Sequence, residues 1–353
     1  MPALQNPTCS TILVTGSNGF LATWIVENLL KAGYNVRASV RSMDRGRHLT
    51  QLFKGDFGDK LEIFPTGDMA QAGAFDEAVK GVDAIIHTAA EVNLNAVEPK
   101  DIIGPAISGY LNLMTSALKY GDRLKRIVIT SSCAAVTSYS DQPITINEKS
   151  WNDASVKECE EKGRDASGLA KYSASKTFAE KAGWDFYEKH KSEIGWDLTI
   201  LNPPWIFGPV LHEVSSLDKL NSSSLFWYNA ITNGKALGDA SPRVSPSDGW
   251  VDVRDAALAH IRSLEIEEAG GERIILCAGP FVFQDAIDAV NLLESSSLWP
   301  SHKEPFAKGD DGEKEYKITW DMAKEKRILG IKFRTHAEMA RDILVDWENK
   351  GWN

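Results

Sequence analysis

The sequence predicts an α/β fold in which helices wind around both faces of a parallel sheet, with a smaller C-terminal lobe beside it. Short apolar segments alternate with stretches of helical periodicity through the first two hundred residues. A glycine-rich turn joins the first apolar segment to the first helical one, and the alternation stops after residue 203. This alternation is typical of parallel sheets, because each connection must cross over a face of the sheet.

Six apolar segments predict buried strands. They lie at 11–15, 34–40, 61–64, 84–89, 126–132 and 197–202. Helical periodicity lies between them at 19–32, 71–80, 101–120 and 172–190. Later segments predict a helix at 252–264, a strand at 272–279, an exposed loop at 308–317 and a final helix at 336–350.

The change of pattern after the sixth strand predicts the domain organisation. Residues 1–203 are expected to form the sheet domain, and residues 240–263 are expected to return to it. Residues 204–239 and 264–353 are then expected to form the substrate-binding lobe. The length of 353 residues suits one large domain or two closely associated ones.

Composition and charge exclude several classes of function. The net charge of −10 argues against a nucleic-acid partner or an anionic membrane surface. No window reaches the roughly 18 apolar residues of a membrane span, and no secretory signal is visible. The four cysteines have no metal-ligand spacing, so we expect reduced thiols, no metal site and a cytoplasmic protein. The expected assembly is a monomer or a homodimer.

A glycine turn, Gly16-Ser-Asn-Gly19-Phe-Leu-Ala22, lies between the first strand and the first helix. Glycines at these places let the backbone turn tightly and approach a pyrophosphate, which the helix N-terminus then faces. A glycine turn without any ligand is the structural alternative. The strand before it and the helix after it favour a dinucleotide-binding domain of the doubly wound, Rossmann type.

The end of the second strand favours NADP(H) over NAD. An acidic residue at that place would bind the ribose hydroxyls of NAD, but this chain has Ser39. Arg41, Arg45 and Arg47 follow, and guanidinium groups suit a 2′-phosphate. For Arg45 and Arg47, a solvated basic helix start is the alternative.

Two tyrosine–lysine pairs share one spacing, Tyr172–Lys176 and Tyr187–Lys191. Four residues apart on a helix, each pair lies on one face. Small residues, Ser-Ala-Ser, follow Tyr172 and leave room for a ligand, whereas Glu-Lys-His after Tyr187 predicts a solvated face. Ser132 ends the fifth strand, at the sheet edge where ligands bind. We therefore expect Tyr172, and not Tyr187, to be catalytic.

These features together give the chain a resemblance to the extended short-chain dehydrogenases. Within them it resembles the dihydroflavonol-4-reductase group, and most of all fungal NADPH-dependent aldehyde or ketone reductases. The residues that carry the resemblance are "TGSNGFLA" (15–22), "VRASVRS" (36–42), "GDM" (67–69), "HTAA" (87–90), "TSS" (130–132), "YSASK" (172–176), "AEKAGWDF" (179–186), "NPPWIFGP" (202–209) and "WVDVRDAALAHI" (250–261).

The resemblance implies a Ser-Tyr-Lys mechanism carried by Ser132, Tyr172 and Lys176. Tyr172 would protonate the carbonyl oxygen as hydride arrives from the nicotinamide, while Ser132 would donate a hydrogen bond to that oxygen. Lys176 would place a positive charge beside the phenol and bind the ribose hydroxyls. The implied reaction is NADPH-dependent reduction of an aldehyde or ketone, small or aromatic, with keto esters and diketones included.

The resemblance also implies two sets of contact residues. Cofactor contacts are expected from Gly16, Ser17, Asn18, Gly19, Phe20, Leu21, Arg41, Asp68, Met69, Thr88, Ala89, Ala90, Thr130, Tyr172, Lys176, Pro203, Pro204, Trp205 and Ile206. The carbonyl substrate, the one small-molecule partner expected, should contact Val92, Leu94, Ser132, Thr137, Tyr172, Trp205, Phe226 and Trp227. For Phe226 and Trp227, the alternative to substrate contact is a position in the hydrophobic core of the lobe.

Other functions are possible on the same scaffold. A sugar-nucleotide epimerase or dehydratase would favour NAD, and a dehydratase would need a carboxylate near Ser132, where Cys133 and Ala134 stand. A dihydroflavonol reductase would have asparagine where Thr137 stands. An NADP-binding regulator without catalysis is a third alternative. His87 is expected to be structural rather than a general base, and Cys133 a buried apolar filler rather than an oxidation-sensitive thiol.

Overall fold

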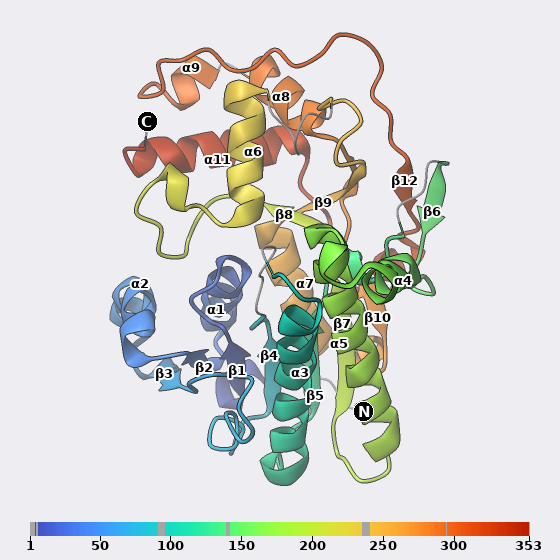
Figure 1. The fold of residues 1–353 in the computed structure, drawn as a ribbon. Coiled ribbons are helices and arrows are strands. Elements are labelled where there is room, and N and C mark those ends of the chain that lie inside the picture. The colour runs from blue at the N-terminus through green and yellow to red at the C-terminus, as the bar shows by residue number, and fades with distance from the viewer. Residues whose placement is uncertain are drawn as a thin grey trace.

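A seven-stranded parallel sheet forms the centre of the computed structural model, which describes residue 4 and residues 6–90, 96–138, 142–234, 241–293 and 295–352 (Figure 1). Its strands, in spatial order, are β10 (Arg273–Ile275), β7 (Asp197–Asn202), β5 (Arg126–Thr130), β4 (Ala84–His87), β1 (Thr11–Thr15), β2 (Asn35–Val40) and β3 (Leu61–Pro65). The strand order reverses between β1 and β4, so a crevice is expected outside the carboxyl ends of these two strands. The doubly wound prediction is confirmed.

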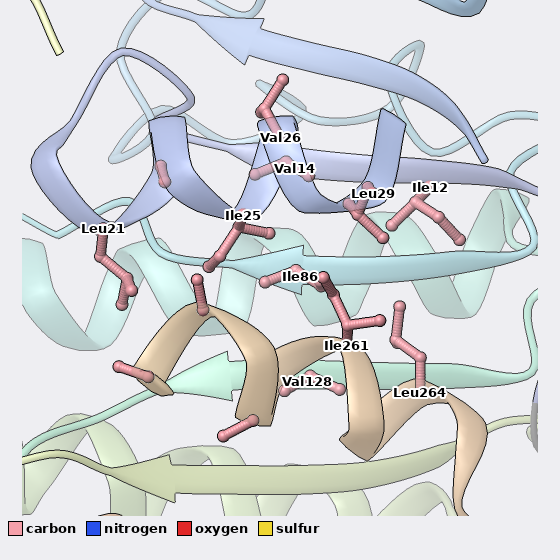
Figure 2. Packing of buried hydrophobic residues seen from close by; sticks show 14 of the residues in the cluster. Ile12, Val14, Leu21, Ile25, Val26, Leu29, Ile86, Val128, Ile261 and Leu264 are labelled. Carbon is pink, nitrogen blue, oxygen red and sulfur yellow. The ribbon is translucent and has the colours of Figure 1, made fainter. Parts of the chain in front are cut away.

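Helices cover both faces of the sheet. One face carries α1 (Phe20–Ala32), α2 (Arg47–Phe57) and α7 (Val253–Glu265); the other carries α3 (Lys100–Tyr120) and α5 (Gly168–His190). Ile12 and Val14 of β1 pack toward α1 and α7, whereas Leu13 between them packs toward α3 and α5. Figure 2 shows the first of these cores, where Ile25 of α1 and Ile261 of α7 meet the strand side chains.

A second layer lies across one end of the sheet, at the top of Figure 1. Its helices are α6 (Ser222–Asn233), α8 (Phe283–Leu292), α9 (Ser295–Leu298) and α11 (His336–Asn349). Its strands β8 (Trp205–Phe207), β9 (Asp248–Asp252) and β11 (Gly279–Phe281) form a small sheet in the order β11-β9-β8. Trp227, Trp299 and Trp347 are completely or almost completely buried in its core. Its helices come from the segments expected in the lobe, whereas β9 comes from the segment 240–263 expected in the sheet domain.

Two smaller groups complete the described chain. The strand β6 (Ile144–Ile146) pairs in parallel with β12 (Ile318–Trp320), and α4 (Asp153–Lys162) packs against α5. The short helix α10 (Ala323–Ile328) precedes Leu329 and Ile331, which belong to the same hydrophobic core as α1 and α7. The predicted loop at 308–317 contains no helix or strand.

The prediction of a helix at 71–80 is wrong. This segment forms consecutive turns without an α-helix, and Gly73 within it has φ = 81°. A left-handed residue interrupts a right-handed helix, because the carbonyls around it no longer align with the helix axis. The turns still bury Phe75 and Val79 against α3, so the apolar spacing has a packing role without a helix.

The predicted domain boundary at residue 264 is also wrong. The strand β10, expected within 264–353 of the lobe, is the edge strand of the large sheet and pairs with β7. Leu329 and Ile331 likewise pack in the core of the large sheet. Before them in the chain, β9 lies within 240–263 but pairs with β8 and β11 in the small sheet, whereas α7, directly after β9, packs on the large one. The chain therefore crosses between the two layers several times.

Among the described residues, none of the helices has the length and apolar character needed to cross a bilayer. The same residues contain no cluster of three or more histidine, cysteine or acidic side chains arranged to hold a metal ion.

Candidate active site

The glycine turn joins β1 to α1 in a conformation that leaves its surface bare. Gly16 has φ = 65°, and a Cβ built on it would lie 3.0 Å from the Cα of Ala89. Gly19 is the N-cap of α1, and its N–H donates to the Gly16 carbonyl at 2.9 Å. Free N–H groups at the start of a helix, with no side chain in front of them, are a binding place for phosphates.

One cavity lies beside this turn at the ends of β2 and β3, and we call it the β2 cavity. It is lined by Gly16, Asn18, Gly19, Ser39, Val40, Arg41, Arg45, Thr66, Gly67, Asp68, Met69, Phe75, Thr88, Ala89 and Ala90. The Ser39 hydroxyl lies 2.8 Å from the Thr66 hydroxyl, at the strand end where an acid would bind NAD. Arg47, in contrast, is exposed and pairs with Asp44 at 2.7 Å.

A second cavity, of about 350 Å³, lies on the other side of the turn, and we call it the tyrosine cavity. It is lined by Gly16, Gly19, Phe20, Leu21, Ala22, Thr88, Thr130, Ser132, Cys133, Ala134, Leu169, Tyr172, Pro204, Trp205, Ile206, Ser222, Ser223, Phe226 and Asp248. Both cavities are lined by Gly16, Gly19 and Thr88, so they meet at the glycine turn and form one groove.

Ser132 is held at the carboxyl end of β5 by its neighbours. It caps a short 3₁₀ turn, where its Oγ accepts a hydrogen bond from the Ala134 N–H at 3.1 Å. Its carbonyl accepts a hydrogen bond of 3.1 Å from Asn202 Nδ2, and the next N–H, of Cys133, donates to the Pro203 carbonyl. The Ser132 side chain therefore faces the tyrosine cavity from a fixed backbone.

Tyr172 and Lys176 lie one turn apart near the start of α5. Tyr172 is half-buried and lines the cavity, whereas Lys176 is 7% exposed, with Nζ 5.7 Å from the centre of the Tyr172 ring. The buried ammonium therefore lies beside the Tyr172 ring, within the range of a cation–π contact. The small residues Ser173, Ala174 and Ser175 are buried against neighbouring protein, so their expected role of leaving room for a ligand is wrong.

Tyr187 is not the solvated side chain that its neighbours predict. It is 4% exposed, and its ring packs against Trp184 and Trp196 in the core beneath α5. Burial raises the pKa of its phenol. Only Lys191 is exposed, and it pairs with Glu188 at 3.1 Å. The charged residues around Tyr187 lie on the outer side of the helix while the ring points inward.

The environment of His87 supports a structural role. Its Nδ1 lies 2.8 Å from the Thr15 hydroxyl at the end of β1, and the ring is buried between Phe75 and Tyr110. Burial, and then the positive charge of Lys176, lower the pKa of His87 to about 3. A ring that is neutral and weakly basic at pH 7 is a poor general base.

Cys133 is buried next to Ser132. Burial raises the pKa of its thiol well above the ordinary value, and its Sγ donates to the Asn202 carbonyl at 3.2 Å. Oxidation of cysteine begins from the thiolate, so this environment opposes it.

The remaining predicted residues fall into three groups. Ser17 and Pro203 hold the backbone of the site: Ser17 Oγ donates to the Val14 carbonyl, and the Pro203 carbonyl accepts from Cys133. Thr137 is buried outside the lining of the cavity, which corrects its expected substrate contact. Val92 and Leu94 lie outside the described residues.

Phe226 and Trp227 are neighbours on α6 but serve different surfaces. Phe226 lines the tyrosine cavity and packs edge-on against Trp205, with ring centres 5.5 Å apart. Trp227 is fully buried in the lobe and packs edge-on against Trp347 at 5.7 Å. Successive helical side chains point about 100° apart, and of these two only Phe226 points to the cavity, while Trp227 points into the core. The expectation that Trp227 contacts substrate is therefore wrong.

The two aromatic residues can be separated by substitution. Phe226→Ala is expected to change the ratio of kcat/KM between small and aromatic carbonyls and to leave the KM for NADPH nearly unchanged. Trp227→Ala should instead lower the free energy of unfolding by about 3–5 kcal/mol, the usual cost of removing a buried tryptophan. Substrate profiles and urea unfolding of both variants check this. An unchanged profile for Phe226→Ala would remove it from the substrate site.

Several residues that line the two cavities lie outside the sequence motifs on which the prediction was based. Leu169, Ser222, Ser223 and Asp248 line the tyrosine cavity, and Thr66 and Phe75 line the β2 cavity. Leu169 is 47% exposed and lies three residues before Tyr172 on α5. Its position before "YSASK" was the one available sequence signal; the others depend on how distant segments pack.

The groove crosses the point where the strand order of the sheet reverses, which is where doubly wound proteins bind dinucleotides. The fold and the groove thus define a nucleotide-binding protein of the Rossmann class. The chain belongs to the NAD dependent epimerase/dehydratase family, whose model matches residues 12–278.

Individual relatives are similar over almost the whole chain. The ketoreductase azaE of Aspergillus niger is 34% identical over 92% of this chain and 93% of its own. The NADPH-dependent methylglyoxal reductase GRE2 of Saccharomyces cerevisiae is 32% identical, over 94% and 96% respectively. The crystal structure of yeast methylglyoxal/isovaleraldehyde reductase Gre2 complexed with NADPH superposes with a TM-score of 0.83 at 30% identity, covering 97% of this chain and 99% of that one.

Proposed function

We propose that this protein is an NADPH-dependent carbonyl reductase that converts an aldehyde or a ketone into an alcohol. The observation that carries the proposal is the single groove with Arg41 in one part and Ser132 with Tyr172 in the other. Its relatives support the same reaction: azaE is named a ketoreductase and GRE2 an NADPH-dependent methylglyoxal reductase.

The described residues fit NADPH as the cofactor. Gly16, which lines both cavities and has no room for a Cβ beside Ala89, and the N-terminus of α1 suit the pyrophosphate. Arg41 and Arg45 line the β2 cavity and form no ion pair within the described part of the chain, so their guanidinium groups are available to a 2′-phosphate. When bound, this cofactor supplies hydride to the carbonyl carbon.

The side chains of the tyrosine cavity complete the reaction. Ser132 Oγ donates a hydrogen bond to the carbonyl oxygen, and Tyr172 Oη delivers a proton to it as negative charge develops. Lys176, buried beside the Tyr172 ring, stabilises the phenolate that remains after proton transfer. We infer that α6 of the lobe selects the substrate, since Phe226, Ser222 and Ser223 bring it to the cavity wall.

An epimerase or dehydratase acting on a sugar nucleotide is the second candidate, and the name of the family includes both reactions. Two features of this chain favour the reductase. Ser39 with Arg41 replaces the acidic end of β2 that suits NAD. The residues after Ser132, Cys133 and Ala134, provide no carboxylate for dehydration.

We further propose a cytoplasmic monomer or homodimer. All four cysteines are unpaired, which suits a reducing compartment.

A cofactor and substrate screen tests the function. Purified enzyme should oxidise NADPH at least tenfold more efficiently than NADH with some member of a panel of aldehydes, diketones, β-keto esters and dihydroflavonols. Tightly retained NAD together with conversion of a UDP-sugar would establish the epimerase instead. NADPH binding without turnover of any carbonyl would indicate a regulator.

A further inference from the structure

We propose that Glu180 is a positioning residue, whose carboxylate holds Ser132 in register with Tyr172 and Lys176. The inference rests on the proposed function. Glu180 lies on α5 one turn after Lys176 and two turns after Tyr172, so the three share one face of the helix. It is completely buried, and no part of it lines the tyrosine cavity.

One oxygen of the carboxylate joins the catalytic helix to the two strand ends around Ser132. Glu180 Oε2 accepts hydrogen bonds from Ser131 Oγ at 2.5 Å and from Asn202 Nδ2 at 2.8 Å. Ser131 directly precedes Ser132, and the same Asn202 amide donates to the Ser132 carbonyl at 3.1 Å. The backbone of Ser132 is thus attached to α5 from both sides through one side chain.

The other oxygen is neutralised by Arg273 of β10. Arg273 Nε donates to Glu180 Oε1, and its Nη1 donates to the carbonyls of Glu148 at 3.0 Å and Ser150 at 2.6 Å. Its guanidinium lies 3.7 Å from the centre of the Trp151 ring. The cation is therefore held by three further contacts, and the carboxylate has a fixed orientation rather than a rotating one.

A second buried ion pair, between the first residues of β5 and β7, provides an internal comparison. Arg126 at the start of β5 and Asp197 at the start of β7 are 1% and 7% exposed, and they form a bidentate pair at 2.5 and 2.8 Å. Arg126 also donates to the carbonyls of Ser263 and Ile266. This pair lies at the opposite end of β5, about 20 Å from Ser132 at ~3.3 Å per strand residue.

The two pairs therefore differ in location more than in burial or chemistry. Either one stabilises the sheet against its helices, and breaking a buried pair is strongly destabilising wherever it lies. Of the two pairs, only the Glu180 pair also determines where the hydroxyl groups of Ser132 and Tyr172 meet the carbonyl oxygen of the substrate. A misplacement of about 1 Å at a reacting centre can cost roughly 100-fold in rate. Loss of a positioning residue should therefore lower the reaction rate of the folded enzyme, in addition to lowering the free energy of unfolding.

The test compares Glu180→Gln with Asp197→Asn, each a removal of one charge from one buried pair. Both variants should unfold at lower urea concentration. Glu180→Gln should lower the single-turnover rate of the folded enzyme by about 10- to 100-fold, and Asp197→Asn should keep it within about twofold. The Kd for NADPH, measured by fluorescence without substrate, should stay within about threefold in both, because the glycine turn and Arg41 do not contact Glu180. Equal losses of rate in the two variants would overturn the proposal.

A double-mutant cycle shows whether Glu180 acts through Ser132. In a Ser132→Ala background, Glu180→Gln should cost less than about threefold, since the hydroxyl it positions is gone, whereas independent residues would give multiplied losses. If Glu180→Gln does not fold, Ser131→Ala removes one of the same contacts with less disruption and should show the same dependence on Ser132. Multiplied losses in the cycle refute the positioning role. A wild-type enzyme that reduces no carbonyl refutes the proposed function instead.

Discussion

Tyr172→Phe is expected to lower kcat by about 10²- to 10⁴-fold, because a positioned general acid typically contributes that much. The substitution removes one hydroxyl from the wall of the tyrosine cavity and keeps the ring beside Lys176. The fold and the Kd for NADPH should therefore survive. Single-turnover oxidation of NADPH measures the chemical step directly, and an unchanged rate would exclude this tyrosine as the proton donor.

Tyr187→Phe is the matched control for this prediction. Tyr187 lies on the same helix with a lysine at the same spacing, and its Lys191 Nζ is 5.4 Å from the ring, close to the 5.7 Å of Lys176 and Tyr172. Its ring lies in the core and lines neither the β2 cavity nor the tyrosine cavity, so kcat should stay within about twofold. Lys176→Ala should cost both rate and NADPH affinity, whereas Lys191→Ala should cost neither. Comparable losses of rate at both tyrosines would contradict the mechanism.

Arg41→Ala is expected to raise the KM for NADPH by about ten- to a hundredfold while hardly changing the KM for NADH. A hydrogen bond between charged groups is worth roughly 1.5–3 kcal/mol, and only NADPH carries the 2′-phosphate that would accept it. Arg41 lines the β2 cavity next to Ser39. Initial rates at varied concentrations of both cofactors give the two KM values.

The control for Arg41 is its neighbour Arg47. Arg47 is exposed, pairs with Asp44 and does not line the β2 cavity, so Arg47→Ala should leave both KM values within about twofold. A wild-type preference for NADH, or equal effects of the two substitutions, would overturn the argument from Ser39 and Arg41.

Local pattern was sufficient for most of the sheet domain. The strands at 11–15 and 197–202 have the predicted bounds, and the other predicted strands of the first two hundred residues differ by a few residues at their ends. Continuous apolar runs mark buried parallel strands, because both of their faces are covered. The glycine turn was equally readable, since a tight turn with a positive φ at Gly16 depends mainly on the residues within it.

Contacts between distant segments could not be predicted in this way. The apolar spacing of 71–80 suits a helix, yet the segment forms turns around Gly73 and buries the same side chains. From its position in the chain, the strand β10 is predicted to belong to the lobe, but it pairs with β7 of the large sheet. Glu180 and Arg273 are 93 residues apart and meet only because α5 and β10 pack at one end of the sheet.

By itself, the sequence predicted the doubly wound sheet, the glycine turn after β1, the arginine at the end of β2 and a short set of candidate catalytic residues. The sequence already favoured Tyr172 over Tyr187 from their neighbours, but the tertiary structure replaces that reason: Tyr172 lines a cavity, whereas Tyr187 lies in the core. It also separates Phe226 from Trp227. Each pair has nearly equivalent local geometry, as the two tyrosine–lysine distances show. What separates their members is whether the side chain meets a cavity or the core, and that depends on the segments that pack against the helix rather than on spacing along it.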